Sequence, residues 1–361
     1  MKLKIPDSIF DVASSITAIA VGLFAGFIIM LISNASQALW AFQTILFSGF
    51  RTMNDLGQVL YFATPIIMTG LSVGFAAKTG LFNIGASGQF IVGAYAAILV
   101  GVTCNFLPGH LHWVAALIAA ILAGALWGAL PGIFKAVFNV HEVITCIMTN
   151  YIGMYLVNFL ITRTIFDSER NQSMRVMDSA NLPGLGMDRI FRDGFIVSSV
   201  NSGIFIAIFF AVLMYFVLEK TVLGYELKAC GFNREAARYA GINEKRSIIL
   251  SMTIAGGLSG LGGALLFLSG SGVAINVVDI LAPQGFSGIP VALLALNNPI
   301  GIIFSGLFIS YLGVGGFNMQ LADFALQIID IIIAVIIYSS AFALIVKGFI
   351  VSLKKRKQGL I

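Results

Sequence analysis

Apolar runs of about 20 residues recur along the whole chain, and they restrict its fold more than any other feature. An α-helix needs a run of this length to cross about 30 Å of hydrocarbon. The composition agrees, because 58% of the residues are apolar and only 10% are charged, which is outside the range of soluble domains. Long uncharged runs also exclude the short alternating strands of a membrane β-barrel. The sequence therefore predicts an all-α polytopic membrane protein, with residues 1–361 forming a single transmembrane domain.

Hydropathy gives the positions of the expected spans. They are 16–33, 57–77, 82–103, 112–134, 143–162, 203–218, 247–268, a short one at 286–297, 299–316 and 324–346. The first run follows two lysines and lacks an evident cleavage signal. We therefore interpret it as a retained span, with a signal anchor as the alternative.

Lysine and arginine orient the spans, because they collect in the cytoplasmic connections. With the N-terminus inside, the connections that hold Lys78, Lys135 and the segment 219–246 all fall inside. The loop 163–202 falls outside, and its five arginines are matched by five acids. The basic C-terminal tail (Lys347, Lys354, Lys355, Arg356 and Lys357) is also expected inside. Both termini inside require an even number of crossings, so the Gly- and Pro-rich stretch 270–316 must add a half-length span, for about ten in total.

Two glycine-containing segments predict interrupted helices. GLFNIGASGQFIVGAYAA (80–97) and QGFSGIPVALLAL (284–296) both begin with Gly, Phe and polar residues, and the topology runs them in opposite directions. Helices broken at matching places in two inverted-topology repeats indicate a solute pathway near the bilayer midplane. The candidate pathway residues here are Asn83, Ser87, Gln89, Phe286 and Ser287. The alternative is that glycines only let helices approach closely, and we prefer it for Gly256, Gly260 and Gly263.

The chain carries no motif for an enzyme, a cofactor or a metal ion. It lacks the G-x-x-x-x-G-K-[ST] loop that cradles nucleotide phosphates. His110 and His112 are expected in an outer loop, and His141 and Glu142 are expected to cap a span. Three cysteines give no disulfide framework. We therefore expect no catalytic residue, no bound cofactor and no metal site.

Buried carboxylates would indicate ion-coupled transport, because such carriers need ionisable residues inside the bundle. Asp330 is the main candidate, since Asp279 and Asp323 lie near the outer boundary. We expect Asp330 to face a polar crevice or a neighbouring helix. An ion-coupled carrier remains an alternative, and a channel is disfavoured because no filter motif or ring of charges is present.

The segment 219–246 stands out because it carries six basic and four acidic residues between two apolar stretches. Its centre, NREAARYAG, predicts a short helix closed by Gly241. A many-span chain with no energy source of its own and one structured cytoplasmic protrusion is best explained by an external motor that acts on this protrusion.

Four stretches of the chain resemble one family of transport proteins. GYELKACGFNREAARYAGIN is similar to the coupling segment of ABC importer permeases of the branched-chain amino acid/ribose type. GLFNIGASGQ, PGIFKAVFNVHEVITCIMTNYIGMYLVNF and GFSGIPVALLALNNPIGI resemble the nucleoside (simple-sugar-like) permeases of bacterial ABC importers. The resemblance covers most of residues 56–345. Ser87 departs from it, since many of those permeases have an acidic residue there.

The resemblance implies an assembly in the bacterial cytoplasmic membrane. This chain would be one of two permease subunits, in a heteromer or a homodimer, and a cytoplasmic ATPase would bind ATP and magnesium. An extracytoplasmic binding protein or lipoprotein would deliver the solute, and no nucleic acid would be involved. The residues expected to contact the ATPase are Asn233, Glu235, Ala236, Ala237, Arg238 and Gly241. Asn150, in a resembling stretch, joins the candidate pathway residues.

The expected cargo is a nucleoside. Apolar and aromatic walls with a few amides and hydroxyls suit a neutral solute that has a flat face and hydroxyl groups. A monosaccharide or a branched-chain amino acid is the alternative cargo for the same type of permease.

Overall fold

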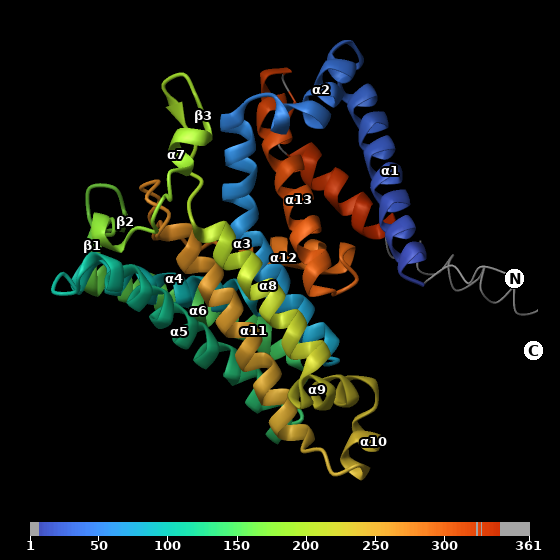
Figure 1. Cartoon of the computed structure of the whole chain (residues 1–361), viewed down its shortest axis with the longest axis vertical. Coiled ribbons are helices and arrows are strands. Elements are labelled where there is room, and N and C mark those ends of the chain that lie inside the picture. The colour runs from blue at the N-terminus through green and yellow to red at the C-terminus, as the bar shows by residue number, and fades with distance from the viewer. Residues whose placement is uncertain (1–6, 323, 326, 340–361) are drawn as a thin grey trace, which may run out of the picture.

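Helices make up almost all of the computed structural model, which describes residues 7–322, 324–325 and 327–339 (Figure 1). The helices are α1 (Asp7–Ser33), α2 (Ala35–Phe47), α3 (Met53–Lys78), α4 (Ala86–Thr103), α5 (Gly109–Phe138), α6 (Glu142–Thr164), α7 (Met187–Ile190), α8 (Gly203–Lys220), α9 (Val222–Phe232), α10 (Arg234–Tyr239), α11 (Glu244–Phe267), α12 (Pro283–Leu294), α13 (Pro299–Met319) and the helix Gln327–Ser339. Single 3-10 turns occupy Ser48–Phe50, Asp178–Ala180 and Gln320–Ala322. Two antiparallel hairpins pair β1 (Phe166–Asp167) with β2 (Gln172–Ser173), and β3 (Arg192–Asp193) with β4 (Ile196–Val197).

Seven described helices are long and apolar enough to cross a membrane: α3, α4, α5, α6, α8, α11 and α13. The other expected spans fall on the shorter apolar helix Ile19–Ser33 within α1, on α12, and on Gln327–Ser339. The all-α polytopic prediction is therefore confirmed. The end of the last expected span, the basic tail and Asp323 lie outside the described residues.

The centre of the bundle is formed by α3 and α11, whose residues are mostly buried. On α11 the packing depends on glycine. A Cβ placed on Gly260 would lie 2.5 Å from the carbonyl oxygen of Ala120, and one on Gly256 would overlap the carbonyl oxygen of Gly124. Gly263 faces α4 in the same way, against the backbone of Phe90. The interpretation of Gly256, Gly260 and Gly263 as close-approach positions is confirmed, because any side chain here would push the helices apart.

The two polar connections lie at opposite ends of α8. The loop 163–202, which contains β1 to β4 and α7, forms one end of the molecule, here called the hairpin end. The helices α9 and α10 form the other, here called the α10 end (Figure 1). The hydropathy pattern predicted this separation.

The helix α2 was not predicted, and two histidines were placed wrongly. Hydropathy did not indicate α2, because Ser36, Gln37 and Gln43 interrupt its apolar run. His110 and His112 lie on the first turn of α5 and not in a loop. His112 is fully buried, with Nδ1 2.8 Å from the hydroxyl of Ser179 and Nε2 3.0 Å from the carbonyl oxygen of Val100. Its two ring nitrogens therefore join α5 to the loop 163–202 and to α4.

Candidate functional site

The two glycine-containing segments meet inside the bundle. In the first, residues 80–85 are non-helical and α4 begins at Ala86. The hydroxyl of Ser87 donates a hydrogen bond of 2.9 Å to the carbonyl oxygen of Ala282, the residue before α12. Gly285 packs directly on the backbone of Ser87. The amino ends of α4 and α12 are therefore in contact, although they are far apart in the sequence.

The helices α4 and α12 leave this contact in opposite directions, as the sequence predicted. Gly101, near the end of α4, packs against Val176 and Ala180 at the hairpin end. The turn after α12 reaches the last part of α3, where Gly74 lies near Asn297. Two helices that start back to back inside a membrane bundle are the arrangement found around solute sites in transporters.

The second interruption lies elsewhere than predicted. Residues 285–288, expected as an unwound element, are helical, and the irregular stretch is 269–282. Pro283 explains this difference, because it occupies the first turn of α12, where its fixed φ suits a helix and its missing N–H is not needed.

A closed amide network surrounds the first interruption. The Asn83 Nδ2 donates to the Gln89 Oε1 over 2.8 Å and to the Ser72 Oγ over 2.9 Å. The Gln89 Nε2 donates in return to the Asn83 Oδ1 over 3.1 Å. Asn83 and Gln89 are at most 1% exposed. These groups satisfy one another and hold the non-helical segment against α3.

Asn150 completes this network from α6. Its Oδ1 accepts a hydrogen bond of 2.7 Å from the backbone N–H of Gly88, and its Nδ2 donates to the carbonyl oxygen of Ile84 over 3.0 Å. Asn83, Ser87, Gln89 and Asn150 are thus brought together, but they are buried in contact with other parts of the chain. Phe286 and Ser287 lie apart from them on α12, and Phe286 is 36% exposed.

We expect Asn150→Leu to lower the free energy of unfolding by about 3 kcal/mol, because it leaves two buried backbone groups without partners. The measurement is thermal denaturation of the purified protein in detergent. Ser287→Ala is the matched control, since the Ser287 hydroxyl bonds only to the carbonyl oxygen of Pro283 in its own helix. Equal melting temperatures for the two variants would contradict a stabilising role for Asn150.

The acidic residues considered for ion coupling are not in this network. Asp330 is exposed on the helix Gln327–Ser339, so no described helix of this chain covers it, and its place in a polar crevice stays a prediction. Asp279 accepts a hydrogen bond of 3.1 Å from the Nδ2 of Asn158. His141 and Glu142 behave as predicted, since His141 caps α6 and Glu142 makes an ion pair of 2.9 Å with Lys135. Within the described residues, no group of His, Cys, Asp and Glu could hold a metal ion.

At the α10 end, α9 is fixed to the membrane helices. The Thr221 hydroxyl caps α9 by accepting a hydrogen bond of 3.1 Å from the N–H of Gly224. A Cβ on Gly231 would lie 2.8 Å from the carbonyl carbon of Thr79, so α9 touches the backbone at the end of α3. Leu227 and Cys230 are buried on the same face. The helix α9 is therefore in direct backbone contact with the end of α3.

The predicted short helix is present as α10. Asn233 caps it, with Oδ1 accepting a hydrogen bond of 3.0 Å from the N–H of Ala236. Gly241 closes it at φ +83°, a left-handed conformation that glycine adopts without strain. Glu235, Arg238 and Tyr239 are exposed, whereas Ala237 is only 4% exposed. Ala237 thus seats α10 on its own chain and does not offer the contact surface that was expected of it.

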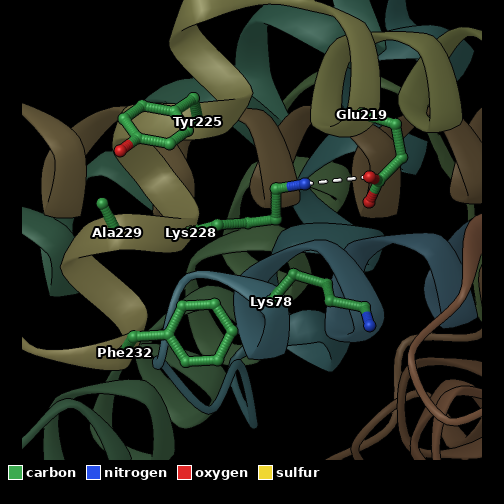
Figure 2. Close-up of a pocket in the computed structure, with 6 residues that line it drawn as sticks. All are labelled: Lys78, Glu219, Tyr225, Lys228, Ala229 and Phe232. Carbon is green, nitrogen blue, oxygen red and sulfur yellow. Dashed lines mark hydrogen bonds and ion pairs between the residues drawn. The ribbon is translucent and has the colours of Figure 1, made fainter.

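Two hollows lie on either side of an exposed apolar ridge of α9 formed by Tyr225, Ala229 and Phe232. The first, of about 570 Å³, also includes Lys78 and an ion pair of 3.0 Å between Lys228 and Glu219 (Figure 2). The second, of about 560 Å³, lies between α9 and α10; its lining residues are Val222, Tyr225, Glu226, Ala229, Phe232, Asn233, Ala236, Ala237, Ala240 and Ile242. Exposed aromatic residues beside surface hollows are typical of protein contact surfaces.

The apolar ridge on α9 was not predicted from the sequence. Tyr225, Phe232 and Tyr239 are 69%, 90% and 97% exposed. The spacing of Val222, Tyr225, Ala229 and Phe232, at i, i+3, i+7 and i+10, could have revealed an apolar face on α9.

Comparisons with known proteins agree with these features. The family described as the branched-chain amino acid transport system/permease component matches residues 56–346. The chain is 38% identical to the guanosine ABC transporter permease protein NupP of Bacillus subtilis, over 94% of this chain and 95% of that protein. No solved structure gives a significant match.

Two further relatives carry related names. The nucleoside ABC transporter permease protein NupB of Lactococcus lactis is 34% identical, over 91% of this chain and 90% of its own. A glucose ABC transporter permease protein of Haloferax volcanii is 31% identical, over 74% of this chain and 70% of that protein. The family match covers most of the chain, from the start of α3 through the last described helix. The chain therefore belongs to the branched-chain amino acid transport system/permease component family.

Proposed function

We propose that this chain is the membrane-spanning permease subunit of an ATP-driven importer for nucleosides. The observation that carries the proposal is the similarity to a guanosine and a nucleoside permease over more than nine-tenths of the chain. The chain supplies the translocation pathway and no catalytic group. ATP and magnesium are bound by a partner ATPase at the α10 end.

The surface of the α10 end supports an ATPase partner. Glu235 and Arg238 are exposed and three residues apart, so both can make polar contacts that fix the register of a docked protein. The ridge of Tyr225 and Phe232 adds apolar area beside them. In this assembly ATP hydrolysis moves α9 and α10, and the contact of Gly231 with the end of α3 carries the motion into the bundle.

The charge distribution supports a cytoplasmic position for the α10 end. Lys78, Lys135 and Lys220 lie in the last turns of α3, α5 and α8, all at this end. The loop 163–202 at the hairpin end balances its arginines with acids. Because Lys and Arg collect on the cytoplasmic side, the hairpin end faces outward, where a substrate-binding protein delivers the solute. This topology places both termini in the cytoplasm of a bacterial cell.

The pathway is formed between two permease subunits. The described pathway candidates inside this chain are closed by their own hydrogen bonds, whereas Phe286 is exposed on α12. A solute path between this chain and a related second permease would use such exposed side chains. Pairing with a second copy of this chain is the alternative.

A sugar is the second candidate for the cargo, because the glucose permease relative is also more than 30% identical. A branched-chain amino acid is suggested by the family description alone. An ion-coupled carrier is disfavoured, since the relatives of this chain are ABC transporter permeases.

Uptake by a deletion strain tests the function. Cells that lack this chain should lose accumulation of radiolabelled guanosine by more than tenfold and keep that of glucose and leucine. Restoring the chain should restore uptake that survives collapse of the proton gradient but needs ATP. Unchanged guanosine uptake in the deletion strain, or uptake that the purified chain performs alone in liposomes and that Asp330→Asn removes, would contradict the proposal.

A further inference from the structure

The exposed face of α6 carries tyrosines near the middle of the helix. Tyr151 and Tyr155 are 49% and 54% exposed on it. Asn158 and Thr162 continue the same line, at spacings of four, three and four residues that place all four side chains on one side of a helix. These four residues are here called the α6 stripe.

The two tyrosines lie at mid-membrane depth. They are nine and thirteen residues after Glu142, about 14 and 20 Å along a helix about 34 Å long. Neither hydroxyl makes a hydrogen bond to another described residue of this chain. A phenol hydroxyl in hydrocarbon without a partner is unfavourable, because it has lost its hydrogen bonds to water and gained none in return. Tyrosines that face lipid are instead found at the membrane surface.

The helix α5 shows what a lipid-facing surface looks like in this protein. Every exposed position between its first and last turns is apolar: Ile118, Leu122, Leu126, Leu130, Ile133 and Phe134. The helix α8 has one exposed tyrosine, Tyr215, but it lies about 8 Å from the end of the helix, at interfacial depth. The polar character of the α6 stripe is therefore not shared by α5, and α8 shares it only near its end.

The α6 stripe is joined to the broken helix α12. The Nδ2 of Asn158 donates to the carbonyl oxygen of Val278 over 3.0 Å and to the Oδ1 of Asp279 over 3.1 Å. Four residues after Asp279, α12 begins, and Phe286 is exposed on its first turns. The stripe and the start of α12 are thus held together by the stretch that connects them.

We infer that the α6 stripe lines the water-filled solute pathway and that Tyr151 and Tyr155 contact the flat face and hydroxyl groups of the cargo. The inference rests on the proposed importer function and adds the binding residues to it. Two phenol rings one turn apart offer aromatic faces for a planar base, and their free hydroxyls can bond to polar groups of a neutral solute. The buried network around Asn83 and Asn150 then has a supporting role, because it fixes α4 and α6 behind the stripe.

Cysteine accessibility tests the placement independently of transport. In the assembled importer in lipid nanodiscs, with Cys104, Cys146 and Cys230 replaced by alanine, Tyr151→Cys and Tyr155→Cys are labelled with a charged, water-soluble thiosulfonate. Leu122→Cys and Leu126→Cys on α5 are the matched controls at similar depth. We expect labelling at least tenfold faster on α6, because only thiols in contact with water ionise and react. Labelling as slow as on α5 would overturn the inference, since the stripe would then face lipid or a dry subunit contact.

Protection by solutes separates this inference from the proposed cargo. Guanosine should slow the labelling of both α6 cysteines severalfold, and glucose should not. Protection by glucose alone would support the pathway and refute the nucleoside assignment. Fast labelling that no transported solute slows would overturn the assignment of the tyrosines as contact residues.

Uptake variants test the chemistry of the contact. Tyr151→Leu combined with Tyr155→Leu should reduce guanosine uptake at least tenfold, and the two Tyr→Phe changes together by about threefold, since phenylalanine keeps the ring and loses the hydroxyl. Tyr215→Leu on α8 should leave uptake unchanged at equal protein level. An equal loss for Tyr215→Leu and the α6 double variant would contradict a specific role.

Discussion

Reversing the two exposed charges of α10, Glu235→Arg together with Arg238→Glu, is expected to reduce uptake and transport-coupled ATP hydrolysis to background, a loss of more than a hundredfold. The folded chain should be unaffected, because Glu235 is exposed and Arg238 makes only a 4.0 Å ion pair with Glu244. Surface ion pairs of this kind contribute less than about 1 kcal/mol. The loss would arise at the contact with the ATPase, where reversed charges meet like charges on the partner.

Co-purification of the ATPase with tagged permease provides the direct readout. Asp193→Lys, a charge reversal in the hairpin β3–β4 at the opposite end of the molecule, is the matched control and should retain the ATPase. Membrane levels of each variant are compared by immunoblot. Normal retention of the ATPase by the Glu235 and Arg238 double variant would refute the assignment of α10 as the coupling surface.

Replacing Gly260 by alanine is expected to destabilise the bundle by about 3 kcal/mol or more, and replacement by leucine should prevent accumulation of the folded chain. The new Cβ would lie 2.5 Å from the carbonyl oxygen of Ala120 and 2.9 Å from the Cα of Gly124. These are backbone atoms of α5, so no rotamer change relieves the overlap and the two helices must separate. The same position is also close to α4, where Gly93 faces Gly260.

Gly313 provides the matched control for this change. It is also in a spanning helix, α13, but a Cβ built there meets nothing within 4 Å. Gly313→Ala should leave stability unchanged or raise it slightly, since alanine is the better helix former. Size-exclusion profiles and thermal denaturation in detergent compare the two variants. Equal stability for both would mean that close packing of α4, α5 and α11 does not limit the stability of the fold.

Hydropathy and charge were enough to predict the architecture, because a bilayer requires long apolar helices with satisfied backbones and sorts basic residues between its two sides. Each expected span coincides with a helix in the described part of the chain. The short helix α10 was also predictable, since Asn233 is a local start signal and Gly241 a local stop signal, and both act within a few residues. The helix α9 was not predicted: its apolar residues recur at helical spacing, but the burial of Leu227 and Cys230 on one face of it is visible only in the tertiary structure.

For the candidate site too, one part was predictable from the sequence and another part was not. The sequence by itself determined that the segment around Asn83 interrupts a helix, because glycine and amides at membrane depth have that effect wherever the helices pack. The interruption expected near Phe286 lies instead at 269–282, ahead of Pro283. Only the tertiary structure decided that Asn83 and Gln89 close on one another and that Asn150 bonds to the backbone beside them. It also decided that Tyr151 and Tyr155 remain uncovered. The physical reason is that hydrogen bonding and exposure depend on which helices are neighbours. Those neighbours are brought together by glycine contacts between α4, α5 and α11, from residues far apart in the chain.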